Sequence, residues 1–235
     1  MLAADLVLTR ELVFAWKEPN DPTTPIHSQV IVEFKNQGKG WAQIFPDLFA
    51  KISVFASSGA LTYEGQGWLG WALPEFVAPG ETGYLFGDGG GLSTKLEDYA
   101  TVEYALGPGS LPGVKTPGTA PCHCFRSVAP PGVTFHMDRI TWRSDASHPG
   151  LLASGSVTVS GGNAIPLARV AVLCIGADGS ILGATTVRYN ISDVHPNEPT
   201  AFDTVDSTPP LKPSDCATSI GLFGVDHSPP SNRPT

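Results

Sequence analysis

The chain carries little charge and has no long run of either sign. Only 15% of its 235 residues are charged, against roughly a quarter in an average domain. Its 14 basic residues are scattered, and the formal net charge is −8. Nucleic acids and anionic membrane surfaces both attract clustered basic residues. We therefore predict that neither is a partner of this protein.

Long apolar runs and a targeting segment are also missing. No stretch approaches the roughly 18 consecutive apolar residues of a transmembrane helix, so we predict no membrane insertion. Residues 1–5 lack the basic and apolar regions of a signal peptide. The low lysine content and the many Thr, Ser, Gly and Pro residues still favour a secreted or cell-surface protein. On that interpretation its leader is absent from this sequence.

Catalytic and cofactor motifs are missing as well. The chain has no Gly-x-Ser-x-Gly elbow and no Asp-x-Asp-x-Asp-Gly calcium loop. The glycine-rich segment Phe86–Gly91 is not followed by the Lys and Ser/Thr of a phosphate loop, so we interpret it as a turn. We predict a protein that is not an enzyme and that has no catalytic residues, cofactor or native metal.

Short strands and turns account for what is present. Gly (26) and Pro (22) are abundant, and helical periodicity is nowhere sustained. In Ile26–Asn36, Val30, Val32 and Phe34 fall on one face of a strand, with Ile31, Glu33 and Lys35 on the other. Ala168–Leu182 has the pattern of two strands joined at Asp178-Gly179. These patterns predict an all-β fold.

The two halves of the chain contain similar segments in the same order, which predicts an internal duplication. The matched pairs are Leu12–Trp16 with Asp138–Trp142, Val32–Asn36 with Val157–Gly161, Ala50–Phe55 with Ala168–Leu173, Pro79–Glu81 with Pro196–Glu198, and Ala100–Leu106 with Ala217–Phe223. The strand number and spacing of each half are typical of a sandwich. We predict two tandem immunoglobulin-like β-sandwich domains at 1–110 and 131–228. A Pro/Gly-rich linker at 111–130 and a tail at 229–235 complete the chain.

A family resemblance rests on segments of both halves. They are Val30–Gly38, Lys51–Ala60 and Pro79–Phe86, and more loosely Ser156–Gly162, Arg169–Leu182 and Pro196–Phe202. Their order resembles that of the small bacterial Ig-like modules of the FxLYD and related type. It covers most of the chain, although the Phe-x-Leu-Tyr-Asp signature itself is absent. The resemblance implies an Ig-like fold in an extracytoplasmic setting, and the family has no catalytic residues to carry over.

The cysteines offer two kinds of chemistry. Cys122-His123-Cys124 contains soft metal ligands, but no second Cys pair lies at zinc-site spacing. Cys-x-Cys is too tight for an unstrained internal disulfide. We therefore predict that Cys122 or Cys124 pairs with Cys174 or Cys216. Four free thiols, a metal site at Cys122–Cys124, and a buried, unpaired Cys174 remain as alternatives.

Aromatic residues supply the candidate binding site. Trp68 and Trp71, with Tyr63 nearby, have no counterpart in the matched segment Gly183–Asn190. Such rings stack on sugars or anchor a partner protein, and these three residues are our ligand-binding candidates. The alternative is that they pack inside the protein, as we expect for Trp16 and Trp142, which occupy matched positions in the two halves.

These features lead to one main hypothesis and two alternatives. The main hypothesis is a non-catalytic extracellular or cell-surface protein with a binding or structural role. The first alternative is a carbohydrate-binding or enzyme-accessory module that uses its Trp residues. The second is a metal-binding protein centred on Cys122–Cys124. A protein or a glycan is the expected partner, and the sequence leaves the oligomeric state open.

Overall fold

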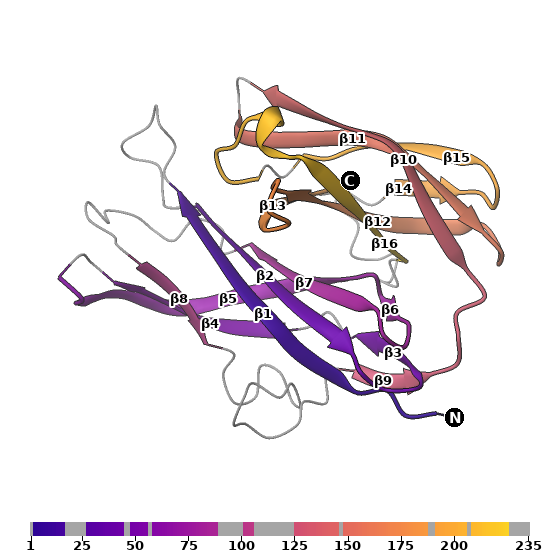
Figure 1. The fold of residues 1–235 in the computed structure, drawn as a ribbon, viewed down its shortest axis with the longest axis horizontal. Coiled ribbons are helices and arrows are strands. Elements are labelled where there is room, and N and C mark those ends of the chain that lie inside the picture. The colour runs from indigo at the N-terminus through magenta and orange to yellow at the C-terminus, as the bar shows by residue number, and fades with distance from the viewer. Residues whose placement is uncertain are drawn as a thin grey trace. The chain divides into compact units, whose positions relative to one another are not determined.

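The computed structural model describes residues 2–16, 27–44, 48–55, 58–88, 101–105, 125–145, 148–187, 191–205 and 208–225. Within these ranges all regular structure is β-strand except one 3₁₀ turn, which confirms the all-β prediction (Figure 1). None of these ranges contains a helix long and apolar enough to cross a membrane. The chain divides into two compact units, Met1–Pro130 with Thr208–Leu211, and Pro131–Ser207 with Lys212–Thr235.

The described part of the first unit contains nine strands. They are β1 (Leu6–Trp16), β2 (His27–Asn36), β3 (Trp41–Ile44), β4 (Leu48–Phe55), β5 (Leu61–Leu73), β6 (Phe76–Val77), β7 (Thr82–Asp88), β8 (Thr101–Ala105) and β9 (Phe125–Val128). Six of them form an antiparallel sheet in the order β1-β2-β7-β5-β4-β8. The other three form a small sheet in the order β6-β3-β9.

The core of the first unit lies where the alternation of β2 predicts it. Val30, Val32 and Phe34 are each 1% exposed and belong to one cluster with residues of β3, β6 and β7. Ile31 and Glu33 alternate with them and therefore belong to the opposite face of the sheet. This division matters because the candidate site is built on that opposite face.

The turn after β2 is held by a buried asparagine. Asn36 is 0% exposed, and its side-chain amide donates to the carbonyls of Gly40 (2.8 Å) and Val77 (3.0 Å). Its Oδ1 accepts from the backbone N–H of Asp5 (3.2 Å) and of Gly38 (3.0 Å). One side chain thus joins the N-terminal segment, the turn and β6 through four hydrogen bonds.

Strand β9 differs from the linker prediction. Its four residues, Phe125–Val128, pair antiparallel with β3 inside the first unit, whereas we assigned them to a linker at 111–130. The side chain of Phe125 packs against the core of that unit. The strand was missed because it is short and follows a Pro/Gly-rich stretch, most of which lies outside the described residues.

The described part of the second unit contains seven strands and the 3₁₀ turn. They are β10 (Thr134–Asp145), β11 (His148–Ser160), β12 (Ile165–Ile175), β13 (Ile181–Thr186), β14 (Ile191–Val194), β15 (Pro199–Asp203), η1 (Pro213–Asp215) and β16 (Thr218–Val225). One sheet has the order β10-β11-β15. In the other, β12 pairs with β13 and β14 along one edge and with β16 along the other.

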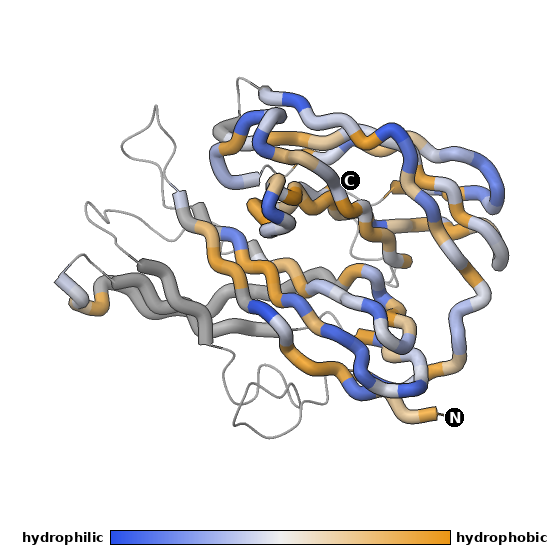
Figure 2. The backbone as a smooth tube through the Cα atoms, viewed as in Figure 1, coloured by the Kyte–Doolittle hydropathy of each residue, from blue (hydrophilic) through white to orange (hydrophobic). Residues whose placement is uncertain are grey.

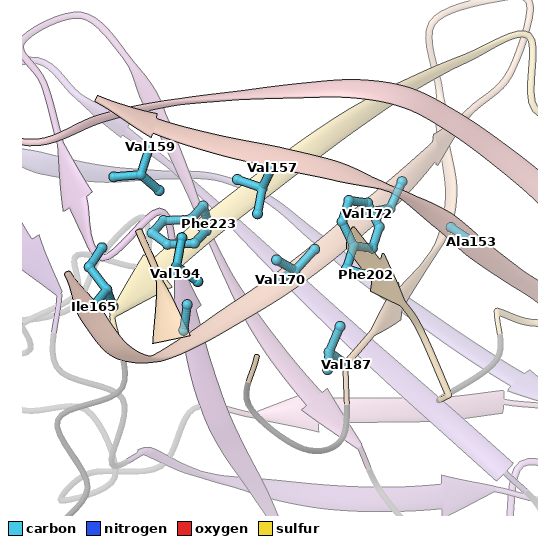
Figure 3. Packing of buried hydrophobic residues seen from close by; sticks show 11 residues of the cluster. Ala153, Val157, Val159, Ile165, Val170, Val172, Val187, Val194, Phe202 and Phe223 are labelled. Carbon is cyan, nitrogen blue, oxygen red and sulfur yellow. The ribbon is translucent and has the colours of Figure 1, made fainter. Parts of the chain in front are cut away.

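The core of the second unit lies between these two sheets. Val157 and Phe202 from the first sheet pack with Val170, Val172 and Phe223 from the second (Figure 3). Hydrophobic residues dominate β12, which is the strand shared by all the pairings of the second sheet (Figure 2). Two sheets that share one apolar core form a β-sandwich.

The β12–β13 hairpin confirms the turn predicted at Asp178-Gly179. Gly179 has φ of 81°, a left-handed conformation that glycine adopts without strain. The Asp178 carboxylate accepts hydrogen bonds from the Ser180 N–H (2.9 Å) and the Ser180 hydroxyl (2.6 Å). These two bonds favour the charged carboxylate and lower the pKa of Asp178 below its usual value.

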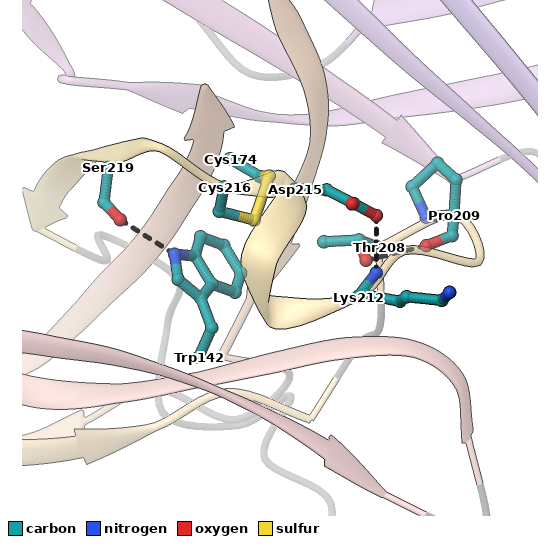
Figure 4. Close-up of a disulfide and its surroundings, with 8 residues drawn as sticks. All are labelled: Trp142, Cys174, Thr208, Pro209, Lys212, Asp215, Cys216 and Ser219. Carbon is teal, nitrogen blue, oxygen red and sulfur yellow. Dashed lines mark hydrogen bonds between the residues drawn. A yellow bond between two sulfur atoms is a disulfide. The ribbon is translucent and has the colours of Figure 1, made fainter. Parts of the chain in front are cut away.

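The cysteine pairing corrects the sequence prediction. Cys174 bonds to Cys216, with their Cα atoms 5.0 Å apart, so neither is available to Cys122 or Cys124 (Figure 4). The disulfide joins the end of β12 to the residue after η1, which an alignment of strand patterns does not reveal. Trp142 lies beside it and donates from its indole Nε1–H to the Ser219 hydroxyl (2.8 Å). Cys122 and Cys124 lie outside the described residues.

Candidate interaction face

The sheet of the first unit has a second ordered face, opposite its core. Because residues paired across antiparallel strands share a face, the register of β1, β2, β7 and β5 places residues there in three rows. The rows are Phe14, Gln29, Asp88 and Trp68; Leu12, Ile31, Phe86 and Trp71; and Arg10, Glu33, Tyr84 and Leu73. We call these twelve positions the outer face.

Several side chains in the middle and last rows of the outer face are buried, although Leu12 is half-buried and Arg10 is exposed. Ile31 is 0% exposed, and Tyr84 and Phe86 are each 6% exposed. The Tyr84 and Phe86 rings lie 6.3 Å apart between centroids, a spacing at which aromatic pairs attract. The sheet therefore buries apolar side chains on both of its faces, as a strand layer does in the middle of a packed structure.

A bulge brings the two predicted tryptophans onto this face. Trp68 and Trp71 are three residues apart, so a regular strand would place them on opposite faces. The β5–β7 register shifts between Leu69 and Trp71, which pairs Trp68 with Asp88 and Trp71 with Phe86. Tyr63 pairs with Val54 in an unshifted part of β5, so it alternates to the other face. The side chains of all three candidates lie outside the described part of the structure.

A polar cluster occupies one corner of the outer face. Arg10 binds both carboxylate oxygens of Glu33, at 3.2 Å from Nε to Oε1 and 2.9 Å from the terminal nitrogen to Oε2. A bulge in β1 between Leu8 and Arg10 lets the Thr9 hydroxyl donate to the same carboxylate at 2.7 Å. The Glu33 side chain is 10% exposed, so these donors replace the water that burial removes.

This cluster also shifts the titration of its neighbours. The hydrogen bonds that Arg10 donates to Glu33 raise the pKa of Arg10, which keeps the guanidinium charged. Burial, followed by the charge of Glu33, raises the pKa of Tyr84 above its usual value near 10.0. Both shifts favour the forms present at neutral pH, namely cationic Arg10 and neutral Tyr84. The cluster is thus built to satisfy buried polar groups.

The first row has two described side chains, Phe14 and Gln29. Phe14 and Gln29 are half-buried, whereas Ile31 and Phe86 in the next row are buried. Trp68 and Asp88 occupy the other two positions of this row. Among the described side chains of the outer face, those of β7 are buried and those of β1 are half-buried or exposed.

The second unit also has an apolar outer face, on the sheet that contains β12. Ala171 and Leu173 point away from the sandwich core, because they alternate with the core residues Val170 and Val172. Both are 0% exposed, and their β16 partners include Leu222, which is 5% exposed. Each unit thus contains a sheet with two apolar faces.

The described structure bears on two sequence predictions, the metal site and the extracytoplasmic setting. In the described ranges no group of three or more His, Cys, Asp or Glu residues is arranged to hold a metal ion. The predicted metal alternative at Cys122–Cys124 lies outside those ranges and stays a prediction. The Cys174–Cys216 disulfide is compatible with an oxidising, extracytoplasmic compartment.

Comparison with known proteins gives no assignment. No protein-family model matches the chain, and no curated protein matches it either. The resemblance to FxLYD-like modules therefore stays a prediction.

The residues of the outer face that sequence reasoning missed are Arg10, Glu33, Tyr84 and Phe86. Their pairing joins β1, β2 and β7, and β7 lies far from the other two in the sequence. The alternation of β2 could have pointed to this face, because it places Ile31 and Glu33 opposite the core residues. An apolar Ile31 on the non-core face indicates a sheet buried on both sides.

Proposed function

We propose that this is a non-catalytic extracellular or cell-surface protein with a binding or structural role, built from two Ig-like modules. The observation that carries the proposal is the outer face of the first unit, where apolar, aromatic and ion-paired residues form a buried second surface. A sheet with two apolar faces is stable only when a further layer of protein covers it. Packing against such a layer is the function that this geometry supports best.

Strand pairing supports the proposal of two related modules. In the first unit the β1–β2 hairpin pairs through β2 with β7. In the second unit the β10–β11 hairpin pairs in the same way, through β11, with β15. The β4–β5 hairpin of the first unit pairs through β4 with β8. The β12–β13 hairpin of the second unit pairs likewise, through β12, with β16.

The conformations of corresponding turns extend this match. Gly80 and Asn197 have φ of 81° and 64°, and each donates its N–H at 2.7 Å to a carbonyl near the end of the preceding hairpin. Gly59 and Gly179 have φ of 79° and 81° in the second hairpins, in which Phe55 pairs with Leu61 and Ile175 with Ile181. By this correspondence Phe55 matches Ile175. The sequence alignment matched Phe55 with Leu173, two residues earlier.

Substitution on the outer face tests the packing role. Phe86→Ala removes a ring that is 6% exposed, and truncating a buried Phe costs about 3–5 kcal/mol. Leu61→Ala is the matched control, because Leu61 is 52% exposed and its truncation should cost less than about 0.5 kcal/mol. Urea unfolding of the full chain measures both. Equal stability of the two variants would show that the outer face is not a packing surface.

Carbohydrate binding is the second candidate, and the residue types that share the first row favour it. In the first row the positions of Phe14 and Trp68 lie on either side of Gln29 and Asp88. Aromatic rings stack on sugar rings, and polar side chains hydrogen-bond to sugar hydroxyls. A glycan array probed with the full chain tests this candidate. Trp68→Ala should abolish binding, and Tyr63→Ala, on the opposite face, should leave it intact. Absence of binding to every glycan, or equal loss in both variants, would rule the candidate out.

A further inference from the structure

Exposed strand edges invite pairing with other chains, and most edges of this protein carry a feature that opposes it. β1 is bulged and contains Arg10, and β10 is bulged beside Arg139, whose φ is 56°. β15 begins with Pro199, and β14 contains Asp193 at φ of 56°. β13, another edge strand of the second unit, is largely buried. The carbonyl of its Thr186 accepts a hydrogen bond from the Val205 N–H.

Strand β16 lacks the charge, proline and bulge of the other edges, although its residues Leu222–Gly224 are buried. Its eight residues, TSIGLFGV, include no charge and no proline. They pair with β12 from Thr218 to Val225 without a register shift. Within the described residues β12 is the only strand that pairs with β16. Because Leu222–Gly224 are buried, the accessible part of the other edge is Thr218–Gly221, whose residues are exposed or half-buried. Thr218 and Ile220 are exposed on this edge, Ile220 by 40%.

We propose that Thr218–Gly221, the accessible part of the β16 edge, pairs antiparallel with the same segment of a second copy of this chain. A two-fold axis through such a pair makes one continuous sheet and closes the assembly at two copies. Residues paired in this way share a face, so Ile220 falls opposite Thr218 or Ile220 of the other copy. Each of these is a β-branched or aliphatic residue of the kind that stabilises cross-strand pairs.

Charge favours β16 over the edge strands β1 and β10 for pairing between two copies. The chain has a net charge of −8, so two copies repel each other at neutral pH. Pairing through an uncharged strand places no like charges directly opposite one another, whereas β1 and β10 would each bring charged residues together. The edge that is least protected is thus also the one where self-pairing adds the least repulsion.

Sedimentation equilibrium of the full chain over a concentration series tests this inference. The wild-type mass should rise from 24.7 kDa towards twice that value. Ile220→Lys places like charges at the pairing edge and should hold the mass at 24.7 kDa, whereas Ile220→Val should still dimerise. Val205→Lys is the matched control, because Val205 is 41% exposed but lies outside β16, and it should behave as wild type.

Hydrogen exchange supplies the second measurement. β16 amides should exchange more slowly as the wild-type concentration rises, and this dependence should disappear in Ile220→Lys. A wild-type protein that stays monomeric overturns the inference. So does a monomer with concentration-independent protection of β16, which would point to another segment of the same chain over this edge. Dimerisation that survives Ile220→Lys with correct folding by circular dichroism also overturns it.

Discussion

Asn36 gives the sharpest test of how the first unit is held together. Its side chain is 0% exposed and makes four hydrogen bonds of 2.8–3.2 Å to Asp5, Gly38, Gly40 and Val77. A typical hydrogen bond contributes about 1 kcal/mol, and a buried group left without a partner costs roughly 1–3 kcal/mol. Because some freed backbone groups will reach water, we expect Asn36→Ala to lower the free energy of unfolding by about 3–5 kcal/mol.

Asn36→Asp refines this test without a change of size. It replaces the two N–H donors with an oxygen that faces the carbonyls of Gly40 and Val77, so its loss of stability should be at least as large at neutral pH. Acid should restore part of the loss, since a protonated carboxyl donates one hydrogen bond. Urea titration followed by hydrogen exchange of β2 and β7 amides reports on this unit alone.

The control for both Asn36 variants is Lys35→Ala, one residue away on an exposed side chain. It should change the stability by less than about 0.5 kcal/mol, as a surface substitution does. An Asn36→Ala protein within that same margin of wild type would refute the reasoning, because it would mean that the four hydrogen bonds contribute no net stability.

Two further predictions concern the disulfide and Tyr84. The Cys174–Cys216 bond spans 42 residues, so the double Cys→Ala variant should lose about 4 kcal/mol by loop-closure entropy, measured by urea unfolding against the oxidised wild type; an unchanged midpoint would contradict this. The raised pKa of Tyr84 means that the folded protein holds this proton more tightly than the unfolded chain, so its contribution is complete below pH 10 and is lost as pH rises through the folded pKa. Tyr84→Phe should flatten that alkaline decline of stability, and an identical decline in both proteins would show that Tyr84 is not its source.

Local patterns in the sequence predicted the local structure well. The alternation of Ile26–Asn36 separated core from outer face correctly in β2, and the Asp178-Gly179 turn joined β12 to β13 as expected. Both depend on neighbours within a few residues, namely a period of two and a glycine that adopts positive φ. Such features are encoded where they occur in the chain.

Long-range pairing set the limit of sequence reasoning. β9 pairs with β3 although 80 residues lie between the two strands in the sequence. Cys174 and Cys216 bond to each other, whereas the sequence prediction paired one of them with Cys122 or Cys124. The binding site at Trp68 and Trp71 stays a prediction, and only the bulge against β7 places both positions on one face and Tyr63 on the other. A bulge depends on its partner strand, so the sequence of β5 alone does not reveal it.

Hydroxyl-radical footprinting of the full chain tests the central claim, that the outer face of the first unit is a buried packing surface. Trp71 pairs with Phe86 in a row where Ile31 is 0% and Phe86 6% exposed. We predict that Trp71 and Phe86 are oxidised far more slowly, relative to their intrinsic reactivity, than Leu2 and Leu61, which are 63% and 52% exposed. Oxidation of Trp71 and Phe86 at the normalised rate of Leu61 would contradict the account.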